Sequence, residues 1–287
     1  MSSIECIVLD FDGTFTRVDE EAAPFVEAFR KGLAAQLARG SSSVDPDQRW
    51  DAAAKVIESD PDRHGWEYDG AIVAPAHADP YIRCTTIGQL LLAEEGLTVG
   101  QRTEILQGLY RECYPLSRTV FRPEAKQVVE AVLASGLPVY VVSNSATEHV
   151  RAKIDSLDPA GKRAIKVRGD ARKFVIHEPE RAHPLFSSLP AQMEVAGLGR
   201  PMYLRRGHYF EALRKIWDET GARPETTMVC GDIFELDLAM PARLGARVHL
   251  VARPETPEYE RRAARAMPGG STSQDLKGLL LHLALPG

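Results

Sequence analysis

Residues 4–16 read IECIVLDFDGTFT, a short apolar run that leads directly into two aspartates, a glycine and a threonine. The run is rich in β-branched side chains, which predicts a buried strand over residues 4–9. Placing two carboxylates, Asp10 and Asp12, at the end of a buried strand is costly unless their charge is paired or bound to a metal. The stretch therefore predicts a polar site at this strand end.

The bulk composition is that of an ordinary globular protein. The chain has 287 residues, of which 44% are hydrophobic and 26% charged, and its formal net charge is −5. This length fits one large domain or two smaller ones. The absence of a large basic excess gives no signal for nucleic-acid binding. Nothing in the composition indicates an oligomeric state.

The sequence also favours a cytoplasmic location. The longest apolar runs are far shorter than the roughly 18 residues of a membrane span, and the N-terminus lacks the pattern of a signal peptide. The four cysteines contain no C-x-x-C pair, so we expect reduced thiols rather than a disulfide framework. No membrane partner is predicted.

Strand and helix patterns alternate from residue 119 onward. Such alternation predicts a parallel sheet with helices on both faces, an α/β fold with a Rossmann-like core. The predicted strands after the first are residues 138–144, 164–169, 226–232 and 246–252. Helices are expected over 123–136, from 147 onward, over 208–220 and over 237–245, with a closing helix over 274–285. Residues 170–204 show no clear pattern.

Residues 17–118 do not continue the alternation. Helical patterns cover 20–38, 46–57, 87–95 and 101–110, and no convincing series of strands occurs between them. We therefore predict an inserted, mostly helical second domain or cap over 17–118. The core is then residues 1–16 plus 119–287.

Polar side chains follow three of the predicted strands. Asp10 and Asp12 follow the first strand, Ser143 and Asn144 end the second, and Asp232 ends the fourth, with Asp237 shortly after. In an open parallel sheet, ligands bind beyond the carboxyl ends of the strands. We expect these groups to converge on one crevice.

The segments DFDGT, VVSNS and GDIFELD resemble the first, second and fourth motifs of the haloacid dehalogenase superfamily. The resemblance covers residues 1–16 and about 119–260, and the insertion after the first motif is similar to that family's helical cap. It implies a phosphatase that uses Mg²⁺ and acts on a small phosphorylated substrate. Magnesium prefers oxygen ligands, which the carboxylates of the crevice supply.

The resemblance also implies a role for each strand-end acid. Asp10 is the candidate nucleophile, which accepts the phosphoryl group as an aspartyl-phosphate. Asp12 would protonate the leaving oxygen and then activate water. The carboxylates of Asp10 and Asp232, with the backbone carbonyl of Asp12, would hold Mg²⁺. Asp237 would orient a metal-bound water or a nearby cation.

The remaining expected roles concern the phosphate and a basic residue. Ser143 and the backbone N–H of Asn144 would bind the phosphate. The family also places a basic residue, typically lysine, before the fourth motif. The candidates are Arg206, Arg205 and Lys173, and we favour Arg206 because it adjoins the predicted start of the helix that leads into the fourth strand.

Other functions remain open at this stage. A phosphomutase or a phosphonate-cleaving enzyme would use the same acids, and a non-catalytic protein that binds a phosphorylated ligand could keep the same fold. Halide displacement fits less well because it has no leaving oxygen for Asp12 to protonate. The sequence does not name the substrate, nor the cap residues that would select it.

Overall fold

The computed structural model describes residues 3–38, 44–76 and 79–283. The chain divides into two compact units, which are Met1–Arg17 with Phe121–Gly287, and Val18–Val120. The division predicted from the sequence placed these two boundaries after residues 16 and 118. No helix among the described residues is long and apolar enough to cross a membrane.

The first unit is built on a six-stranded sheet whose order is β10-β9-β8-β1-β4-β5. Every neighbouring pair in this sheet is parallel. The strands are β1 (Cys6–Leu9), β4 (Val139–Val142), β5 (Lys166–Arg168), β8 (Thr227–Gly231), β9 (Arg247–Val251) and β10 (Gly270–Ser273). The predicted α/β fold with a parallel sheet is confirmed.

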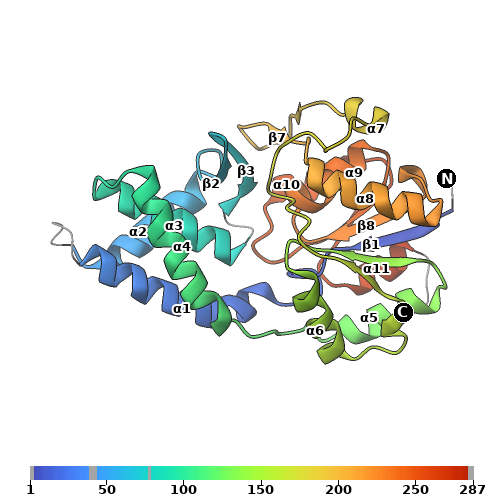
Figure 1. Cartoon of the computed structure of the whole chain (residues 1–287), viewed down its shortest axis with the longest axis horizontal. Helices are drawn as coiled ribbons and strands as arrows, with labels where there is room; N and C mark the ends of the chain where they lie inside the picture. The colour runs from blue at the N-terminus through green and yellow to red at the C-terminus, as the bar shows by residue number, and fades with distance from the viewer. Residues whose placement is uncertain (1–2, 39–43, 77–78, 284–287) are drawn as a thin grey trace. The chain divides into compact units, whose positions relative to one another are not determined.

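Helices cover both faces of this sheet (Figure 1), because successive side chains of each strand point to opposite faces. In β1, Cys6 and Val8 belong to one hydrophobic cluster, while Ile7 and Leu9 belong to the other. The helices of the first cluster are α8 (Gly207–Thr220), α9 (Ala239–Arg243) and α10 (Glu258–Ala266). Those of the second cluster are α5 (Ala125–Ala134), α6 (Thr147–Leu157) and α11 (Lys277–His282). Short 3₁₀ turns cover Lys162–Ala164 and Pro224–Thr226.

The strands that follow β1 in the chain are added first on one side of β1 and then on the other. The chain leaves β1, returns as β4 beside it and continues outward to β5, and then crosses over to build β8, β9 and β10 on the other side. The carboxyl ends of β1, β4 and β8 therefore lie side by side. This is the topological switch point at which such sheets bind ligands.

The sequence prediction gave five strands of the main sheet rather than six, and it also missed helix α10. The edge strand β10 reads GSTS and so lacks the apolar run that marks a buried strand. Helix α10 buries a narrow apolar stripe, chiefly Tyr259 and Ala263, within a strongly charged segment. The end of the predicted closing helix, residues 284–285, lies outside the described residues.

The segment that had no clear pattern, residues 170–204, contains little regular structure. It holds the short helix α7 (Pro184–Ser187) and an antiparallel pair, β6 (Gln192–Met193) and β7 (Met202–Tyr203). Phe186, Leu189, Leu198 and Leu204 from this segment are buried in the same cluster as α8. The segment thus forms part of the core of the first unit.

The second unit has its own core, centred on Phe25, Phe29, Leu33 and Leu91. Its helices are α1 (Val18–Leu37), α2 (Pro46–Ser59), α3 (Pro80–Glu94) and α4 (Val99–Cys113), followed by a 3₁₀ turn at Tyr114–Leu116. The sequence showed no convincing series of strands in this mostly helical region, and the hairpin of antiparallel strands β2 (Gly65–Tyr68) and β3 (Ala71–Pro75) was not predicted. Asp69 and Gly70, with φ of 50° and 74°, form its two-residue turn.

Candidate active site

The loop after β1 makes a tight turn that brings Asp10 and Asp12 to the end of the sheet. The Asp10 N–H donates to the Cys230 carbonyl at the end of β8, at 2.8 Å. Gly13 has a φ of 83°, a left-handed conformation that favours glycine. A Cβ at this position would also lie 2.3 Å from Oδ2 of Asp232. Glycine is therefore required for the loops after β1 and β8 to approach each other this closely.

Asp10 is 8% exposed and is held by two side chains. Its Oδ1 accepts a hydrogen bond from Nζ of Lys173 at 2.8 Å, and its Oδ2 accepts one from Oγ1 of Thr14 at 3.1 Å. Burial raises the pKa of the Asp10 carboxyl, and the Lys173 ammonium opposes that rise. Lys173 therefore favours the ionised form of this buried carboxyl.

Lys173 is shared between two carboxylates of the site. Its Nζ lies 2.8 Å from Oδ1 of Asp10 and 2.8 Å from Oδ1 of Asp237, and the side chain is 1% exposed. The ammonium also lies 5.2 Å from the centre of the Tyr209 ring. Burial alone would lower the pKa of Lys173, but Asp10 and Asp237 outweigh it and raise that pKa. Lys173 is thus a permanent cation at the centre of the site.

Hydrogen bonds connect the loop that carries Lys173 to the loop after β4. The N–H groups of Asp170 and Ala171 donate to the carbonyls of Ser145 and Ser143, each at 3.0 Å. The N–H of Lys173 donates to Oδ1 of Asn144 at 2.7 Å. Asp170 and Arg172 have φ of 53° and 44°. Left-handed conformations cost non-glycine residues on the order of 1 kcal/mol or more, and such strain gathers at functional sites.

The expectation that Arg206 provides the cation beside Asp10 is wrong. The geometry gives this position to Lys173. Arg206 lies next to the start of α8 and makes no side-chain capping hydrogen bond, and its guanidinium donates to the backbone carbonyl of Lys173. Arg205 pairs with Glu178 at 2.7 Å on the surface. Lys173 reaches the site because the unpatterned segment after β5 folds back over the strand ends.

Asp12 is surrounded by three donors. Its Oδ2 accepts from Oγ of Ser145 at 2.7 Å and from Oγ of Ser143 at 3.2 Å, while its Oδ1 lies 2.6 Å from Nζ of Lys153 on α6. The side chain is 24% exposed, in contrast to the buried Asp10. The two carboxylates therefore lie in different environments, which is the arrangement that lets two acids take different roles.

Three buried acids form a candidate metal centre. One oxygen from each of Asp10, Asp232 and Asp237 lies within 4.8 Å of the others. Arg253, itself 4% exposed in its side chain, orients Asp232 with Nε 3.0 Å from Oδ2. An all-oxygen, anionic donor set suits Mg²⁺, so these residues fit the expected cation. The predicted set used the Asp12 carbonyl and not Asp237, and the ligand set stays a prediction.

The structure thus brings the predicted strand-end residues to one edge of the sheet, Arg206 excepted. Sequence reasoning missed Ser145, Lys153, Thr14 and Arg253. Ser145 could have been found, because it is the second serine of the VVSNS motif. Lys153 carries no local signal, because it lies within α6 and far from the end of β4. Arg253 could have been found, because it follows the end of β9 by two residues.

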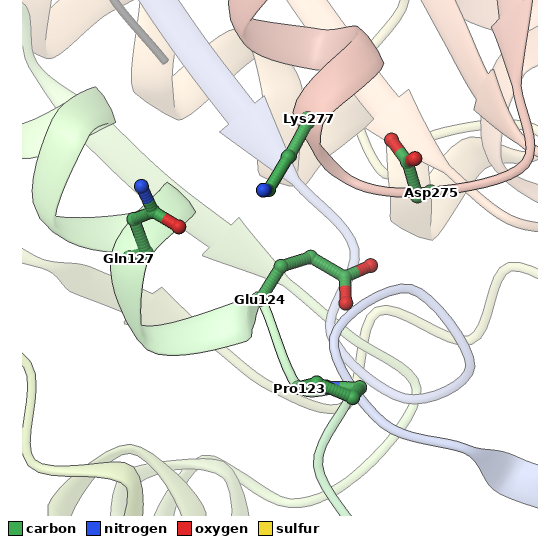
Figure 2. A pocket seen from close by; sticks show the side chains of 5 residues that line it. All are labelled: Pro123, Glu124, Gln127, Asp275 and Lys277. Carbon is green, nitrogen blue, oxygen red and sulfur yellow. The ribbon is translucent and has the colours of Figure 1, made fainter.

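A surface pocket of the first unit lies apart from these acids (Figure 2). Its lining residues are Pro123, Glu124, Gln127, Asp275 and Lys277. Oε1 of Glu124 accepts from the N–H of Leu276 at 3.2 Å, so this carboxylate joins the start of α5 to that of α11. None of the strand-end acids lines this pocket.

Comparison with known proteins agrees with this geometry. A family model described as haloacid dehalogenase-like hydrolase matches residues 4–245. No curated protein matches the chain.

Several solved structures share the fold at low sequence identity. A protein described as a haloacid dehalogenase-like hydrolase from Bacteroides fragilis has 15% identity and a TM-score of 0.50, over 96% of this chain and 100% of that one. A predicted phosphoglycolate phosphatase from Haemophilus somnus has 15% sequence identity and a TM-score of 0.50, and the match covers 98% of each chain. A protein described as a HAD-hydrolase from Bacillus subtilis, bound to magnesium, has 12% sequence identity and a TM-score of 0.50. The match covers 99% of this chain and 100% of that one.

Proposed function

We propose that this chain, which belongs to the haloacid dehalogenase-like hydrolases, is a magnesium-dependent phosphatase that acts on a small phosphorylated metabolite. The observation that carries the proposal is the pair Asp10 and Asp12. One carboxylate is buried against the ammonium of Lys173, and the other is half-buried beside two hydroxyls and the ammonium of Lys153. We assign the role of nucleophile to the buried Asp10 and that of acid–base group to the more exposed Asp12.

In the first step, a carboxylate oxygen of Asp10 attacks the phosphorus of the ester. A bond forms between Asp10 and phosphorus, and the bond from phosphorus to the leaving oxygen breaks. Asp12, entering this step in its protonated form, gives its proton to the leaving oxygen, which departs as an alcohol. The product is an aspartyl-phosphate on Asp10.

In the second step, Asp12 takes a proton from a water molecule, whose oxygen attacks the phosphorus. The bond between Asp10 and phosphorus breaks, which releases inorganic phosphate and restores the Asp10 carboxylate. Ser143 supports both steps, because its hydroxyl can turn from Asp12 to a phosphate oxygen. The backbone N–H of Asn144 is the second proposed phosphate donor.

Charge balance supports a metal at this site. Lys173 and Arg253 provide two positive charges against the three carboxylates of Asp10, Asp232 and Asp237. A phosphoryl group adds further negative charge. A bound Mg²⁺ would supply the missing positive charge and polarise the phosphoryl oxygens.

The unit formed by residues 18–120 is proposed to act as a cap that selects the leaving group, and this stays a prediction. The cytoplasmic location also stays a prediction. It is supported by the four cysteines, which are all free and buried.

The proposal is tested by phosphate release from a panel of phosphorylated metabolites and from p-nitrophenyl phosphate. We expect turnover with Mg²⁺, none after chelation with EDTA, and recovery when Mg²⁺ is restored. Asp10→Asn and Asp232→Asn should each abolish turnover, whereas Asp218→Asn, an exposed acid on α8, should leave it unchanged.

Full activity after exhaustive chelation would contradict the metal, and wild-type turnover by Asp10→Asn would contradict the covalent mechanism. Binding of phosphorylated ligands without turnover would favour the non-catalytic alternative. Transfer of the phosphoryl group to a second sugar would favour a phosphomutase.

A further inference from the structure

A group of three charged side chains is buried within the first unit, behind Lys173. Arg206 and Glu235 are fully buried and Arg200 is 9% exposed. None of the three belongs to the acids and cations that surround the proposed phosphoryl site. Arg200 lies in the unpatterned segment, and Glu235 lies between Asp232 and Asp237 without a predicted role of its own.

The contacts within this group are specific. Arg200 binds Glu235 through both ends of its guanidinium, with Nη1 2.8 Å from Oε1 and Nη2 2.7 Å from Oε2. Nη2 of Arg206 lies 3.9 Å from Oε1 of the same carboxylate. Glu235 therefore lies between two guanidinium groups, and the charges form an Arg–Glu–Arg group.

Two members of this group, Arg206 and Glu235, connect to residues of the site. Arg206 donates to the backbone carbonyl of Lys173, the residue whose ammonium holds Asp10. Glu235 lies in the π-helical turn Phe234–Leu238, two residues before Asp237, which is the other carboxylate bound by Lys173. The group thus connects the backbones that carry both partners of this ion pair.

Stability alone is a weak explanation for such an arrangement. Removing three charges from water is costly, and a buried ion group is often no more stabilising than apolar residues of the same volume. A rigid, bidentate guanidinium pair does fix geometry, because its two parallel hydrogen bonds define the orientation of both partners. Geometry is also what phosphoryl transfer depends on most strongly.

We propose that Arg206 and Glu235 are positioning residues: the buried Arg200–Glu235–Arg206 group fixes Lys173 and Asp237 so that the ammonium meets Asp10. The inference rests on the proposed function for its catalytic consequence. Its structural part, the placement of the Lys173 ammonium, does not depend on it.

The first test is the kinetics of Glu235→Gln and Arg206→Met on p-nitrophenyl phosphate. Glu235→Gln is nearly isosteric but loses the charge that both guanidinium groups face. We expect kcat to fall roughly 10- to 100-fold per folded molecule, with KM changed little, because remote misplacement acts on the chemical step. Arg205→Met, next to Arg206 but paired with Glu178 at the surface, is the matched control and should keep wild-type kcat.

A double-mutant cycle shows whether Arg206 acts through Lys173. If it does, Lys173→Met combined with Arg206→Met should be no slower than Lys173→Met alone, because coupled residues are not additive. Independent, multiplying effects of the two changes would overturn the proposal.

The second test does not need activity. A buried ammonium held by two carboxylates exchanges its protons slowly and gives a proton–nitrogen NMR signal of its own, which is assigned by its loss in Lys173→Met. We expect this signal to shift or broaden in Glu235→Gln and to stay unchanged in Arg205→Met. An unchanged signal in Glu235→Gln, with unchanged kcat, would overturn the proposal. A changed signal in an enzyme without phosphatase activity would support the positioning role while contradicting the proposed function.

Discussion

Two acids share the single ammonium of Lys173, and the charge balance of the site depends on it. Three carboxylates are buried at the strand ends, and an uncompensated buried charge is strongly destabilising. Arg253 serves Asp232, so Asp10 and Asp237 share a single ammonium. The same ammonium lies beside the position at which negative charge would grow during phosphoryl transfer.

Replacing Lys173 by methionine keeps most of the length of the unbranched side chain and removes its charge. We expect Lys173→Met to lower kcat by on the order of 10²-fold, as loss of one preorganised electrostatic group does. Steady-state kinetics on p-nitrophenyl phosphate measures this, with Lys215→Met on the exposed face of α8 as the control. A kcat within a factor of two of the wild type would show that the metal alone balances the charge.

The role of Asp12 predicts a different defect from that of Asp10. An Asp12→Asn variant should still form the aspartyl-phosphate from p-nitrophenyl phosphate, because nitrophenolate departs without a proton. Release of phosphate needs activated water and should slow by roughly 10²- to 10⁴-fold. Rapid mixing should show a burst of nitrophenolate equal to the enzyme concentration, followed by slow turnover. Slow formation of nitrophenolate without a burst would assign another role to Asp12.

At the residue scale, the sequence predicted what is local. Asp10, Asp12, Ser143, Asn144, Asp232 and Asp237 each lie at or just after a strand, and the order of parallel strands brings such positions together. The choice between Arg206 and Lys173 was not local. It depended on how the segment after β5 folds back, and hydrophobic periodicity does not describe a segment that is held by loop hydrogen bonds.

At the scale of elements, the edge strand β10 is held to β9 by an unusual polar contact. Ser271 and Ser273 of β10 flank the buried ring of His249 in β9, with Nδ1 2.7 Å from Oγ of Ser271 and Nε2 2.8 Å from Oγ of Ser273. Oγ of Ser273 donates onward to the Asp275 carbonyl at 2.5 Å. Nε2 therefore carries the proton, and Nδ1 accepts from Ser271. The neutral imidazole of His249 thus adds two side-chain hydrogen bonds between β9 and the polar strand β10.

Stability should therefore fall as the pH falls. Burial lowers the pKa of His249 to about 4, whereas an unfolded histidine has a pKa of about 6.5. A lowered pKa means that the fold favours the neutral ring, so its contribution is complete above the unfolded value and is lost as the pH falls from 6.5 to 4. The full loss is roughly 3 kcal/mol.

Urea unfolding at pH 7 and at pH 4.5 measures this effect. His249→Gln, which cannot gain a proton in this range, should lose less stability between the two pH values than the wild type does. His149→Gln on the exposed face of α6 should behave as the wild type. Equal pH dependence in the wild type and in His249→Gln would contradict the assignment.

Prediction of elements succeeded where packing follows the apolar pattern. The buried strands β1, β4, β8 and β9 and the amphipathic helix α8 were found because each buries a regular apolar face. The β2–β3 hairpin was missed although its turn, Asp69–Gly70, is a strong hairpin signal. Only Val73, Ala74 and Pro75 of β3 are fully buried, so the alternation expected of a strand is weak.

At the scale of the whole molecule, the chain consists of two units with separate cores. The change of pattern near residues 17 and 119 was visible in the sequence. Apolar residues recur with different spacings in a parallel α/β unit and in a helical unit. Separate cores do have a thermodynamic consequence, because a defect in one need not unfold the other.

Phe29 tests this independence. It is fully buried in the core of unit 18–120, with its ring centre 6.5 Å from that of Trp50. Phe29→Ala should cost about 3 to 5 kcal/mol, because a cavity is left in a packed cluster. We expect this unit to unfold at lower urea than the first unit. Trp50 and Trp66 report on one unit and Trp217 on the other, so variants with phenylalanine at the remaining tryptophans separate the two transitions.

The reciprocal variant, Leu213→Ala on α8, is the matched control because Leu213 is fully buried in the core of the first unit. It should lower the Trp217 transition and leave that of Trp50 unchanged, whereas Phe29→Ala should do the reverse. Coincident transitions for both probes in both variants would mean that the two cores unfold as one cooperative unit. Shifts confined to one probe in each variant would show that the helical insertion can vary in sequence without loss of the fold that carries Asp10 and Lys173.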